Sequence, residues 1–548
     1  MSSIPIAKMI PPFEKRGKVS VRQIFSQISA KAWLVILIGL GLRLWVGLHA
    51  VIINPDGALY IHQAMALYFK NWSSLKTCFP PFVSSYPVLI AGGYYLVHDW
   101  VLSARLISLF FGTAMLVPLY LMLKEWVRED SAILTLLVFA VTPVLVSNSV
   151  ELVRDPICWF FLCAGTFAVI RQATKHSRWL LLVASLCFLA AIWARIEAAL
   201  FFAITLGYLL YFQNNRRTIN ILIFLSPILA ISLFSIPGLM VSGLSFNDLH
   251  RGHEIAGKFI KPIIQYQKMA ESLKELAWSS PNPFMEFFLP EARNMIWLIA
   301  LGTLLNRFLE AFFYPFVVFY IVGLSGIHRK VQSDSRLLYL ALLTVSGLAL
   351  LYVQTLETWM LYYRFFGIVM IPGAILCAFG VEKLLEILPT RLSVHSATVF
   401  FVIFLLIIGV SLPKNLKSSD PDKSVFIQIG ETVFQNAPTS SGTRIATSRH
   451  IQLWISFYAN IHLPGAVPCP LDLTNCWESF PDNPDQFDDY LRQNRLDFVL
   501  WEEKNWPFHN FTQSNSDVFK TYKELGRWYH KDTGNMILYA VGHAKDDR

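Results

Sequence analysis

The sequence predicts an all-α polytopic membrane domain of about eleven transmembrane helices, followed by a water-exposed α/β domain. Three observations support this fold class. Of 548 residues, 54% are hydrophobic and only 15% are charged, whereas a soluble domain carries about 25% charge. The apolar residues form long blocks, and a helix needs roughly 20 of them to cross the hydrocarbon core. After Pro413 the composition becomes polar and mixed.

The net charge of +9 does not indicate nucleic-acid binding, because the lysines and arginines lie in short clusters between apolar blocks. That arrangement is typical of topology signals. The basic segment 1–32 precedes the first apolar block without a small-residue cleavage site. It is therefore expected to be a cytoplasmic segment before a retained helix rather than a signal peptide.

The predicted transmembrane domain covers residues 33–412. Its spans are expected at 33–53, 104–123, 131–149, 157–171, 179–194, 197–212, 219–241, 308–326, 337–355, 365–380 and 394–412. With the N-terminus inside, every inner loop is basic, as the positive-inside rule requires. The odd number of spans then places residues 413–548 outside.

Two shorter apolar stretches, 86–97 and 295–307, would raise the count to about thirteen if they also spanned. The first stretch is about twelve residues long, which suits an interfacial or re-entrant helix. Counting it as a span would put most of the basic clusters outside. We therefore expect a non-spanning helix there.

The first outer loop, 54–103, opens with Asn54-Pro-Asp-Gly-Ala-Leu-Tyr60-Ile-His62. Pro55 suits a helix start, and Asp56 lies where an acidic side chain favours the helix dipole. Asp56 and Tyr60 are four residues apart and share a helix face. Two interpretations stay open. Asp56 caps this helix, or its carboxylate at the membrane surface accepts a proton from a hydroxyl nucleophile.

Two further outer turns carry charges. Asp155 precedes Pro156 before the fourth span and suits a helix start. Arg195 and Glu197 lie between two closely spaced spans. Either they form an ion pair with each other, or Arg195 binds a phosphate while Glu197 holds it in place.

Basic residues also mark two later outer segments. Tyr363 and Arg364 enter the tenth span, where the arginine either snorkels to the interface or binds an anionic headgroup. The long loop 242–294 carries Arg251, Lys258 and Lys261 among apolar residues. It is expected to form amphipathic segments on the membrane surface. Ionisable residues at membrane depth are costly and usually functional, and here they gather on one side.

The sequence lacks a Walker A loop, a dinucleotide glycine fingerprint, an HExxH zinc helix and a paired-cysteine zinc site. A donor substrate is therefore not expected to bind a soluble nucleotide-binding fold. Cys469 and Cys476 lie close together in the tail and are expected to be able to pair outside the cytoplasm.

The order of these motifs resembles the GT-C polyprenyl-phosphate-sugar glycosyltransferases, which include protein O-mannosyltransferases and lipid A aminoarabinose transferases. The likeness is to the bacterial "family 39" branch and covers about residues 30–385. The matching motifs are Asp56-Gly-Ala-Leu-Tyr60, Pro80-Pro-Phe-Val-Ser-Ser-Tyr-Pro87, Ala104-Arg-Leu106, Val153-Arg-Asp-Pro156, Arg195-Ile-Glu197 and Tyr363-Arg364 with Pro372. Many relatives have Asp-Glu where this chain has Asp56-Gly57, and Ile196 replaces the usual proline.

The resemblance implies transfer of a sugar from a polyprenyl phosphate to a lipid, glycan or protein acceptor on the extracytoplasmic face of a bacterial inner membrane. Asp56 would be the general base, with Asp155 orienting the acceptor or an arginine. Arg195, Arg364 and basic residues of the 242–294 loop would stabilise the phosphate leaving group. Tyr60, His62, Glu197 and Tyr363 would support the site. The implied displacement inverts the anomeric centre.

Some relatives use a divalent metal, which Asp56 and Asp155 would ligate here, although two carboxylates are a weak ligand set. Two other classes stay open. A lipid-linked polysaccharide polymerase or ligase would depend on arginine and histidine in a large outer loop, such as Arg251 and His253. A lipid or sugar transporter would show internal repeats and mid-membrane charges, and neither is evident.

In the tail, β-like runs at 444–448, 497–501 and 536–540 alternate with helix candidates at 421–436, 449–459 and 485–495. This alternation predicts a small α/β domain over residues 413–548. The domain is expected either to help select the acceptor or to buttress the outer loops.

Overall fold

The computed structural model describes residues 26–77, 82–212, 216–242, 250–279, 282–417, 421–437, 442–463, 465, 468–477, 480, 483–508 and 518–541. Of these, the side chains of residues 234–242, 250–256, 258, 259, 484 and 485 are not described. The chain divides into two compact units. The first unit comprises Met1–Val46, Ser108–Val150 and Arg154–Lys417, and the second comprises Gly47–Ile107, Glu151–Val153 and Ser418–Arg548.

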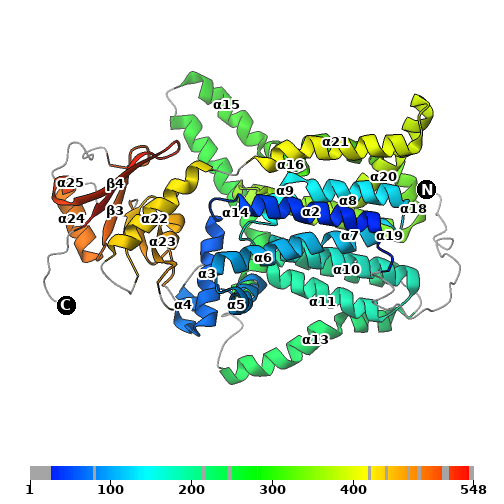
Figure 1. Ribbon diagram of the computed structural model, residues 1–548, viewed down its shortest axis with the longest axis horizontal. Helices are drawn as coiled ribbons and strands as arrows, with labels where there is room; N and C mark the ends of the chain where they lie inside the picture. The colour runs from blue at the N-terminus through cyan, green and yellow to red at the C-terminus, as the bar shows by residue number, and fades with distance from the viewer. Residues whose placement is uncertain are drawn as a thin grey trace. The chain divides into compact units, whose positions relative to one another are not determined.

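The first unit is helical. Its elements, with two helices that extend past its bounds, are α2 (Ala30–Leu48), α6 (Trp100–Ala114), α7 (Leu116–Leu123), α8 (Glu129–Val141), α9 (Pro143–Asn148), α10 (Asp155–Lys175), α11 (Trp179–Ala194), η2 (Ile196–Ala198), α12 (Ala199–Phe212), α13 (Arg217–Ser242), α14 (His250–Ser279), α15 (Pro283–Asn294), α16 (Ile296–Phe312), η4 (Tyr314–Phe316), α17 (Val317–Leu324), α18 (Ile327–Ser333), α19 (Ser335–Thr358), η5 (Tyr363–Phe366), α20 (Gly367–Leu392) and α21 (Ser396–Leu416). Helices α7, α8, α10 and α11 run alongside one another (Figure 1).

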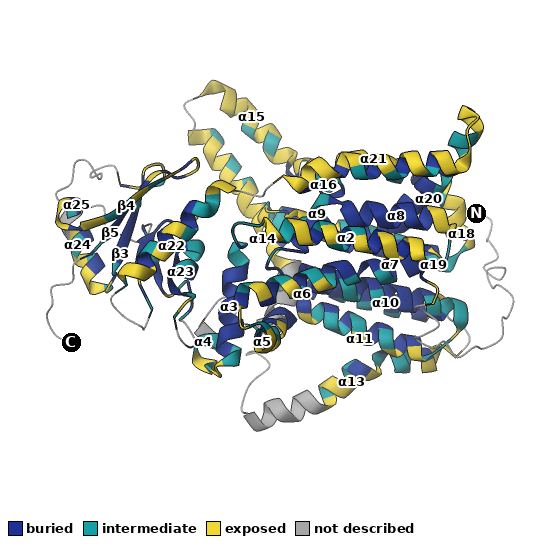
Figure 2. Ribbon diagram, in the orientation of Figure 1, coloured by how far each residue is buried: buried dark blue, intermediate teal, exposed yellow. Residues whose placement is uncertain are grey.

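The helices of this unit have the lengths and compositions of membrane spans. Among the described residues, six helical segments are long and apolar enough to cross a membrane, or seven if one bent pair forms a single span. Four shorter apolar helices, Trp179–Ala194, Ile196–Phe212, Arg217–Leu233 and Tyr314–Leu324, lie near other predicted spans. In Figure 2, α8 is buried along its length while α21 exposes much of its apolar surface. The chain is an integral membrane protein.

Proline residues interrupt two of the predicted spans. The stretch 131–149 forms α8 and α9, because Pro143 cannot donate the next helical hydrogen bond. The predicted span 308–326 is wrong in its bounds. Helix α16 ends at Phe312, Phe313 has a φ of 65°, and Pro315 lies in the short helix η4 that precedes α17. The stretch 295–307 is the apolar part of α16, which is bent by 75° against α15.

Side chains satisfy carbonyl groups near the break between α8 and α9. Asn415 donates through Nδ2 to the carbonyl of Val141 at 2.8 Å. Arg43, which is fully buried on α2, donates to the carbonyl of Ala140 at 2.8 Å. A proline break exposes such carbonyls, and leaving them unpaired in a buried site is costly.

The second unit combines three helices of the 54–103 segment with the C-terminal α/β domain. Its elements are α3 (Pro55–Tyr68), α4 (Trp72–Thr77), α5 (Ser85–Val97), η6 (Pro421–Lys423), α22 (Ser424–Asn436), β1 (Ile445–Thr447), α23 (Gln452–Asn460), β2 (Thr474–Cys476), α24 (Pro484–Gln493), β3 (Phe498–Glu502), α25 (Val518–Thr521), β4 (Lys523–His530) and β5 (Gly534–Ala540). Helix α5 confirms the short helix predicted at 86–97, and its 13 residues are too few to span.

The five strands form one sheet in the order β2-β1-β3-β5-β4. Strand β1 is parallel to β2 and β3, whereas β5 is antiparallel to β3 and β4. Alternate residues face opposite sides, so Phe498 and Leu500 pack with α22 and α23 while Val499 packs with α24. Figure 1 shows α22 and α23 beside strand β3. The predicted α/β domain is confirmed, and β2 and β4 are additional strands.

Cys469 and Cys476, which were expected to be able to pair, do not form a disulfide with each other. Cys476 carries a thiol whose Sγ donates to Gln452 Oε1 at 2.9 Å. Cys469 is disulfide-bonded, but not to Cys476. Cys476 lies on β2, where the strand pairing directs its side chain to α23.

Candidate active site

The first group of predicted residues lies at the start of α3 in the second unit. The capping side chain is Asn54, whose Oδ1 accepts from the Asp56 main-chain N–H at 3.0 Å. Asp56 therefore lies in the first turn, as predicted, but does not cap the helix. Its side chain is partly exposed.

The residues that follow on α3 are buried. The Tyr60 ring packs edge-on against Tyr86 of α5, with centroids 5.5 Å apart. His62 Nε2 lies 3.3 Å from the Ser74 hydroxyl of α4. These contacts hold α3 against its neighbours, and in its first turn Pro55 and Asp56 are partly exposed. Pro80 and Pro81 of the proline-rich motif lie outside the described residues.

The second group lies in the first unit, where three separate segments meet. Asp155 opens α10, Arg195 and Glu197 occupy the turn between α11 and α12, and Arg364 lies in η5. Arg195 Nη1 donates to Asp155 Oδ1 at 2.7 Å, and Arg195 Nη2 donates to Glu197 Oε1 at 3.3 Å. The Arg364 Nε lies 3.8 Å from Asp155 Oδ2. We call Asp155, Arg195, Glu197 and Arg364 the charge network.

The charge network is almost completely buried. The side chains of Asp155, Arg195 and Glu197 are less than one-tenth exposed, and that of Arg364 is 12% exposed. Two carboxylates face two guanidinium groups, so the buried charges compensate each other. The Arg195 guanidinium also lies over the Phe365 ring, 4.3 Å from its centroid. Of the two alternatives for Arg195 and Glu197, the structure displays the ion pair.

Close helix packing brings Arg364 to Asp155. Gly367 begins α20, and a Cβ there would fall 2.0 Å from Nε1 of Trp159, one turn after Asp155 on α10. Only glycine allows this approach. The contact seats η5 on the N-terminal end of α10, so Arg364 and Asp155 meet.

A third group joins the predicted Tyr363 to two residues that were not predicted from the sequence. Arg307 and Glu310 of α16 are 3.0 Å apart, and the Tyr363 hydroxyl donates to Glu310 Oε2 at 2.6 Å. Arg307 also donates to the Tyr363 oxygen, and its guanidinium lies over the Tyr363 ring. The Arg307 side chain is 41% exposed. The sequence feature that could have indicated this group is the pair of opposite charges, Arg307 and Glu310, three residues apart inside an apolar stretch.

The third group adjoins the charge network through the chain itself, because Tyr363 and Arg364 are consecutive in η5. The Arg307 guanidinium is exposed, whereas the Arg364 guanidinium is buried and its charge is compensated by Asp155. An anion approaching η5 can therefore meet Arg307 without first displacing a buried carboxylate.

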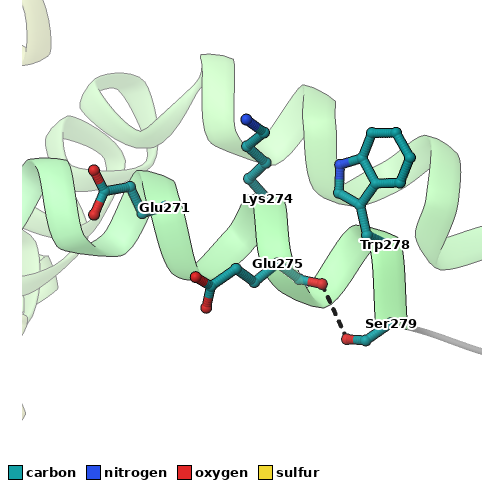
Figure 3. Close-up of a pocket in the computed structure, with 5 residues that line it drawn as sticks. All are labelled: Glu271, Lys274, Glu275, Trp278 and Ser279. Atoms are coloured by element: carbon teal, nitrogen blue, oxygen red, sulfur yellow. Dashed lines mark hydrogen bonds between the residues drawn. The ribbon is translucent and has the colours of Figure 1, made fainter.

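The basic residues predicted on the 242–294 loop lie on α14. The side chains of Arg251 and Lys258 lie outside the described ones, and Lys261 is exposed. A surface hollow further along α14 is lined by Glu271, Lys274, Glu275, Trp278 and Ser279 (Figure 3). All five residues come from one helix, and the Ser279 hydroxyl bonds the Glu275 carbonyl of that helix at 3.0 Å. The hollow therefore contains none of the predicted site residues.

Within the described part of the chain, no group of three or more His, Cys, Asp or Glu side chains is arranged to hold a metal ion. Asp155 instead bonds an arginine.

Comparisons with known proteins agree with this architecture. Residues 80–239 match the family described as dolichyl-phosphate-mannose-protein mannosyltransferase. No characterised protein sequence matches the chain. The structure is similar to ArnT from Cupriavidus metallidurans bound to undecaprenyl phosphate, with a TM-score of 0.54 and 10% identity over 94% of this chain and 99% of that one.

The chain has the fold of the GT-C glycosyltransferases. A second similar structure, the archaeal oligosaccharyltransferase AglB from Archaeoglobus fulgidus in complex with an inhibitory peptide and a dolichol-phosphate, has a TM-score of 0.52. The two share 12% identity over 93% of this chain and 74% of AglB. The GT-C fold predicted from the order of the short motifs is confirmed.

Proposed function

We propose that this protein is a membrane glycosyltransferase that moves a sugar from a polyprenyl-phosphate donor to an acceptor on the extracytoplasmic face. The observation that carries the proposal is the charge network beside the exposed Arg307, on a GT-C fold. The similar structures hold undecaprenyl phosphate or dolichol-phosphate. Arginines at membrane depth rarely persist without a functional reason.

In this mechanism Asp56 is the general base. It takes the proton of an acceptor hydroxyl as that oxygen attacks the anomeric carbon. The bond from the anomeric carbon to the phosphate oxygen breaks, and polyprenyl phosphate leaves with the electron pair. A single displacement of this kind inverts the anomeric centre. Partial exposure of Asp56 in the first turn of α3 leaves its carboxylate accessible to an acceptor.

The arginines stabilise the negative charge that develops on the leaving phosphate. We assign direct contact to Arg364 and Arg307, because Arg195 already donates to two carboxylates. Glu197 then holds Arg195, Arg195 holds Asp155, and Asp155 in turn orients Arg364. Lys261 of α14, together with Arg251 and Lys258, is a further candidate for the phosphate.

The basic inner loops support an orientation with the N-terminus in the cytoplasm and the α/β domain outside. The bacterial inner membrane is the location that fits this orientation and a polyprenyl-phosphate donor.

The test uses purified protein with a panel of polyprenyl-phosphate sugars and cell-envelope acceptors. It follows release of polyprenyl phosphate by wild type and by Asp56→Asn. We expect acceptor-dependent release by wild type and a loss of at least about 100-fold in the variant, since a positioned base contributes roughly 10²–10⁴-fold. Asp99→Asn, which alters an exposed carboxylate of the same loop, is the control. Equal release by wild type and Asp56→Asn would remove Asp56 from the mechanism.

A further inference from the structure

The segment that leads into Asp56 is held by its own unit at several points. Helix α2 ends at Leu48 and α3 begins at Pro55. Arg105 donates to the carbonyl of Ala50 in the linker between them at 2.9 Å, and to that of Gly47 in the last turn of α2 at 3.4 Å. Arg105 is the arginine of the Ala104-Arg-Leu106 motif, so this motif fixes the start of the linker.

Two side chains of α23 hold both main-chain polar groups of Ile53. Trp454 Nε1 donates to the Ile53 carbonyl at 2.8 Å, and the Ile53 N–H donates to the Tyr458 hydroxyl at 3.2 Å. Trp454 and Tyr458 are four residues apart and share one face of α23. Ile53 itself is buried. We call Trp454 and Tyr458 the α23 clamp.

The residues on either side of Asp56 are fixed as well. Asn54 Nδ2 donates to Glu151 Oε2 at 3.2 Å while its Oδ1 caps α3. A Cβ on Gly57 would meet the Leu152 Cβ at 2.6 Å, so α3 lies against the 151–153 segment at this point. Asp56 therefore lies between positions that cannot shift independently of the clamp.

Helix α3 also packs tightly on α23. A cavity of about 20 Å³ between them is lined by Ala58, His62, Phe457 and Asn460, among others. That volume holds about one water molecule. Helix α3 consequently has little room to move against α23, and a change at the clamp is transmitted to its first turn.

We propose that the C-terminal α/β domain positions Asp56 for proton transfer through Trp454 and Tyr458. The inference rests on the proposed role of Asp56 as the base. A displacement of about 1 Å in a catalytic group costs roughly 10²-fold in rate, and Ile53 is three residues from Asp56. The domain thus acts on turnover through α3, and Trp454 and Tyr458 are positioning residues.

The test uses Trp454→Phe and Tyr458→Phe in the full chain, because each change removes one hydrogen bond to Ile53 and keeps an aromatic ring. We expect kcat to fall about 10- to 100-fold with the KM for the donor unchanged. We also expect faster hydrogen exchange over residues 50–58. Trp72→Phe on α4 and Tyr529→Phe on β4 are the matched controls, since both side chains are exposed and neither belongs to the clamp. Both controls should retain wild-type kcat and exchange.

The possible outcomes distinguish failure of the positioning role of the α23 clamp from failure of the proposed role of Asp56 as the base. Unchanged exchange over residues 50–58 in both clamp variants, or a loss confined to KM, overturns the inference. If Asp56→Asn is inactive but both clamp variants turn over like wild type, only the positioning role fails. If Asp56→Asn turns over like wild type, the base assignment fails, whatever the clamp variants do.

Discussion

Arg195 illustrates how a buried charge acquires its partners at the scale of a single residue. Its guanidinium donates through two nitrogens to two different carboxylates and stacks on Phe365. A planar fork with several fixed donors can make these contacts together, whereas an ammonium is a compact point charge. Removing one partner of a buried pair leaves an uncompensated charge, which costs about 3–5 kcal/mol.

We therefore predict that Arg195→Lys lowers transferase activity at least about tenfold and also lowers the thermal midpoint of unfolding. The lysine cannot reach Asp155 and Glu197 with the same geometry, so Arg364 loses an oriented partner. The control is Arg527→Lys, which alters an exposed pair with Glu524 on β4. Wild-type activity and midpoint in Arg195→Lys would show that the charge network does not depend on the guanidinium.

At the scale of elements, glycines set how closely helices approach. A Cβ on Gly323 of α17 would fall 1.9 Å from the Leu376 carbonyl oxygen, and one on Gly380 of α20 would fall 1.8 Å from the Phe319 carbonyl oxygen. The two main chains are therefore in direct contact. Small residues allow such approach between membrane helices, where packing rather than hydrophobic exclusion stabilises association.

Gly380→Ala is expected to force α17 and α20 apart and to destabilise the protein by about 1–3 kcal/mol, the usual cost of overpacking. Gly409→Ala on α21 is the control, because a Cβ there meets nothing within 4 Å. The measurement is the thermal midpoint in detergent. A midpoint for Gly380→Ala at or above that of Gly409→Ala would contradict the close contact.

A second element-scale prediction concerns the break between α8 and α9. Asn415→Leu leaves the Val141 carbonyl without its donor, which should cost about 1–3 kcal/mol. Asn436→Leu is the matched control, since Asn436 also donates to the carbonyl four residues earlier but is exposed. Equal thermal midpoints for the two variants would mean that the break does not need Asn415.

At the scale of the whole molecule, sequence patterns predicted what depends on composition and periodicity. The apolar blocks predicted most helices within a few residues, and alternating runs predicted β1, β3 and β5. Strand β4 was missed because its residues are largely exposed and polar, and β2 because its three residues, Thr474–Cys476, contain no apolar alternation. The third group escaped because Arg307 and Tyr363, 56 residues apart, meet only through tertiary packing.

The site residues were predicted only in part, again because sequence patterns do not show contacts that arise from tertiary packing. Motif order indicated Asp155, Arg195 and Arg364 individually, and the fold brings them together. No pattern indicated that Trp454 and Tyr458 hold Ile53, because the contact joins residues about four hundred positions apart. Arg43 likewise lies within a predicted span. It donates to the Ala140 carbonyl near the break between α8 and α9, and apolar periodicity did not predict that break.

The last prediction concerns the pH dependence of the α/β domain's stability. Glu502 at the end of β3 is fully buried and accepts from the Ser448 hydroxyl at 2.9 Å and from Asn505 at 2.8 Å. Burial raises the pKa of the Glu502 carboxyl above its ordinary value, and these donors only partly oppose the rise. The folded state then binds the proton more tightly than the unfolded state, for which the pKa is about 4.3.

Stability linked to Glu502 is therefore fully present below pH about 4.3 and decreases as the pH rises from there through the raised folded pKa. Glu502→Gln removes this titration. Its lost hydrogen bonds cost the same at every pH, so the stability of wild type relative to Glu502→Gln should decrease from pH 4 towards pH 7. Unfolding of the domain is followed by tryptophan fluorescence in the full chain, with Glu431→Gln on the exposed face of α22 as the control. A difference between wild type and Glu502→Gln that is constant or grows with pH would show that burial does not dominate at this carboxylate.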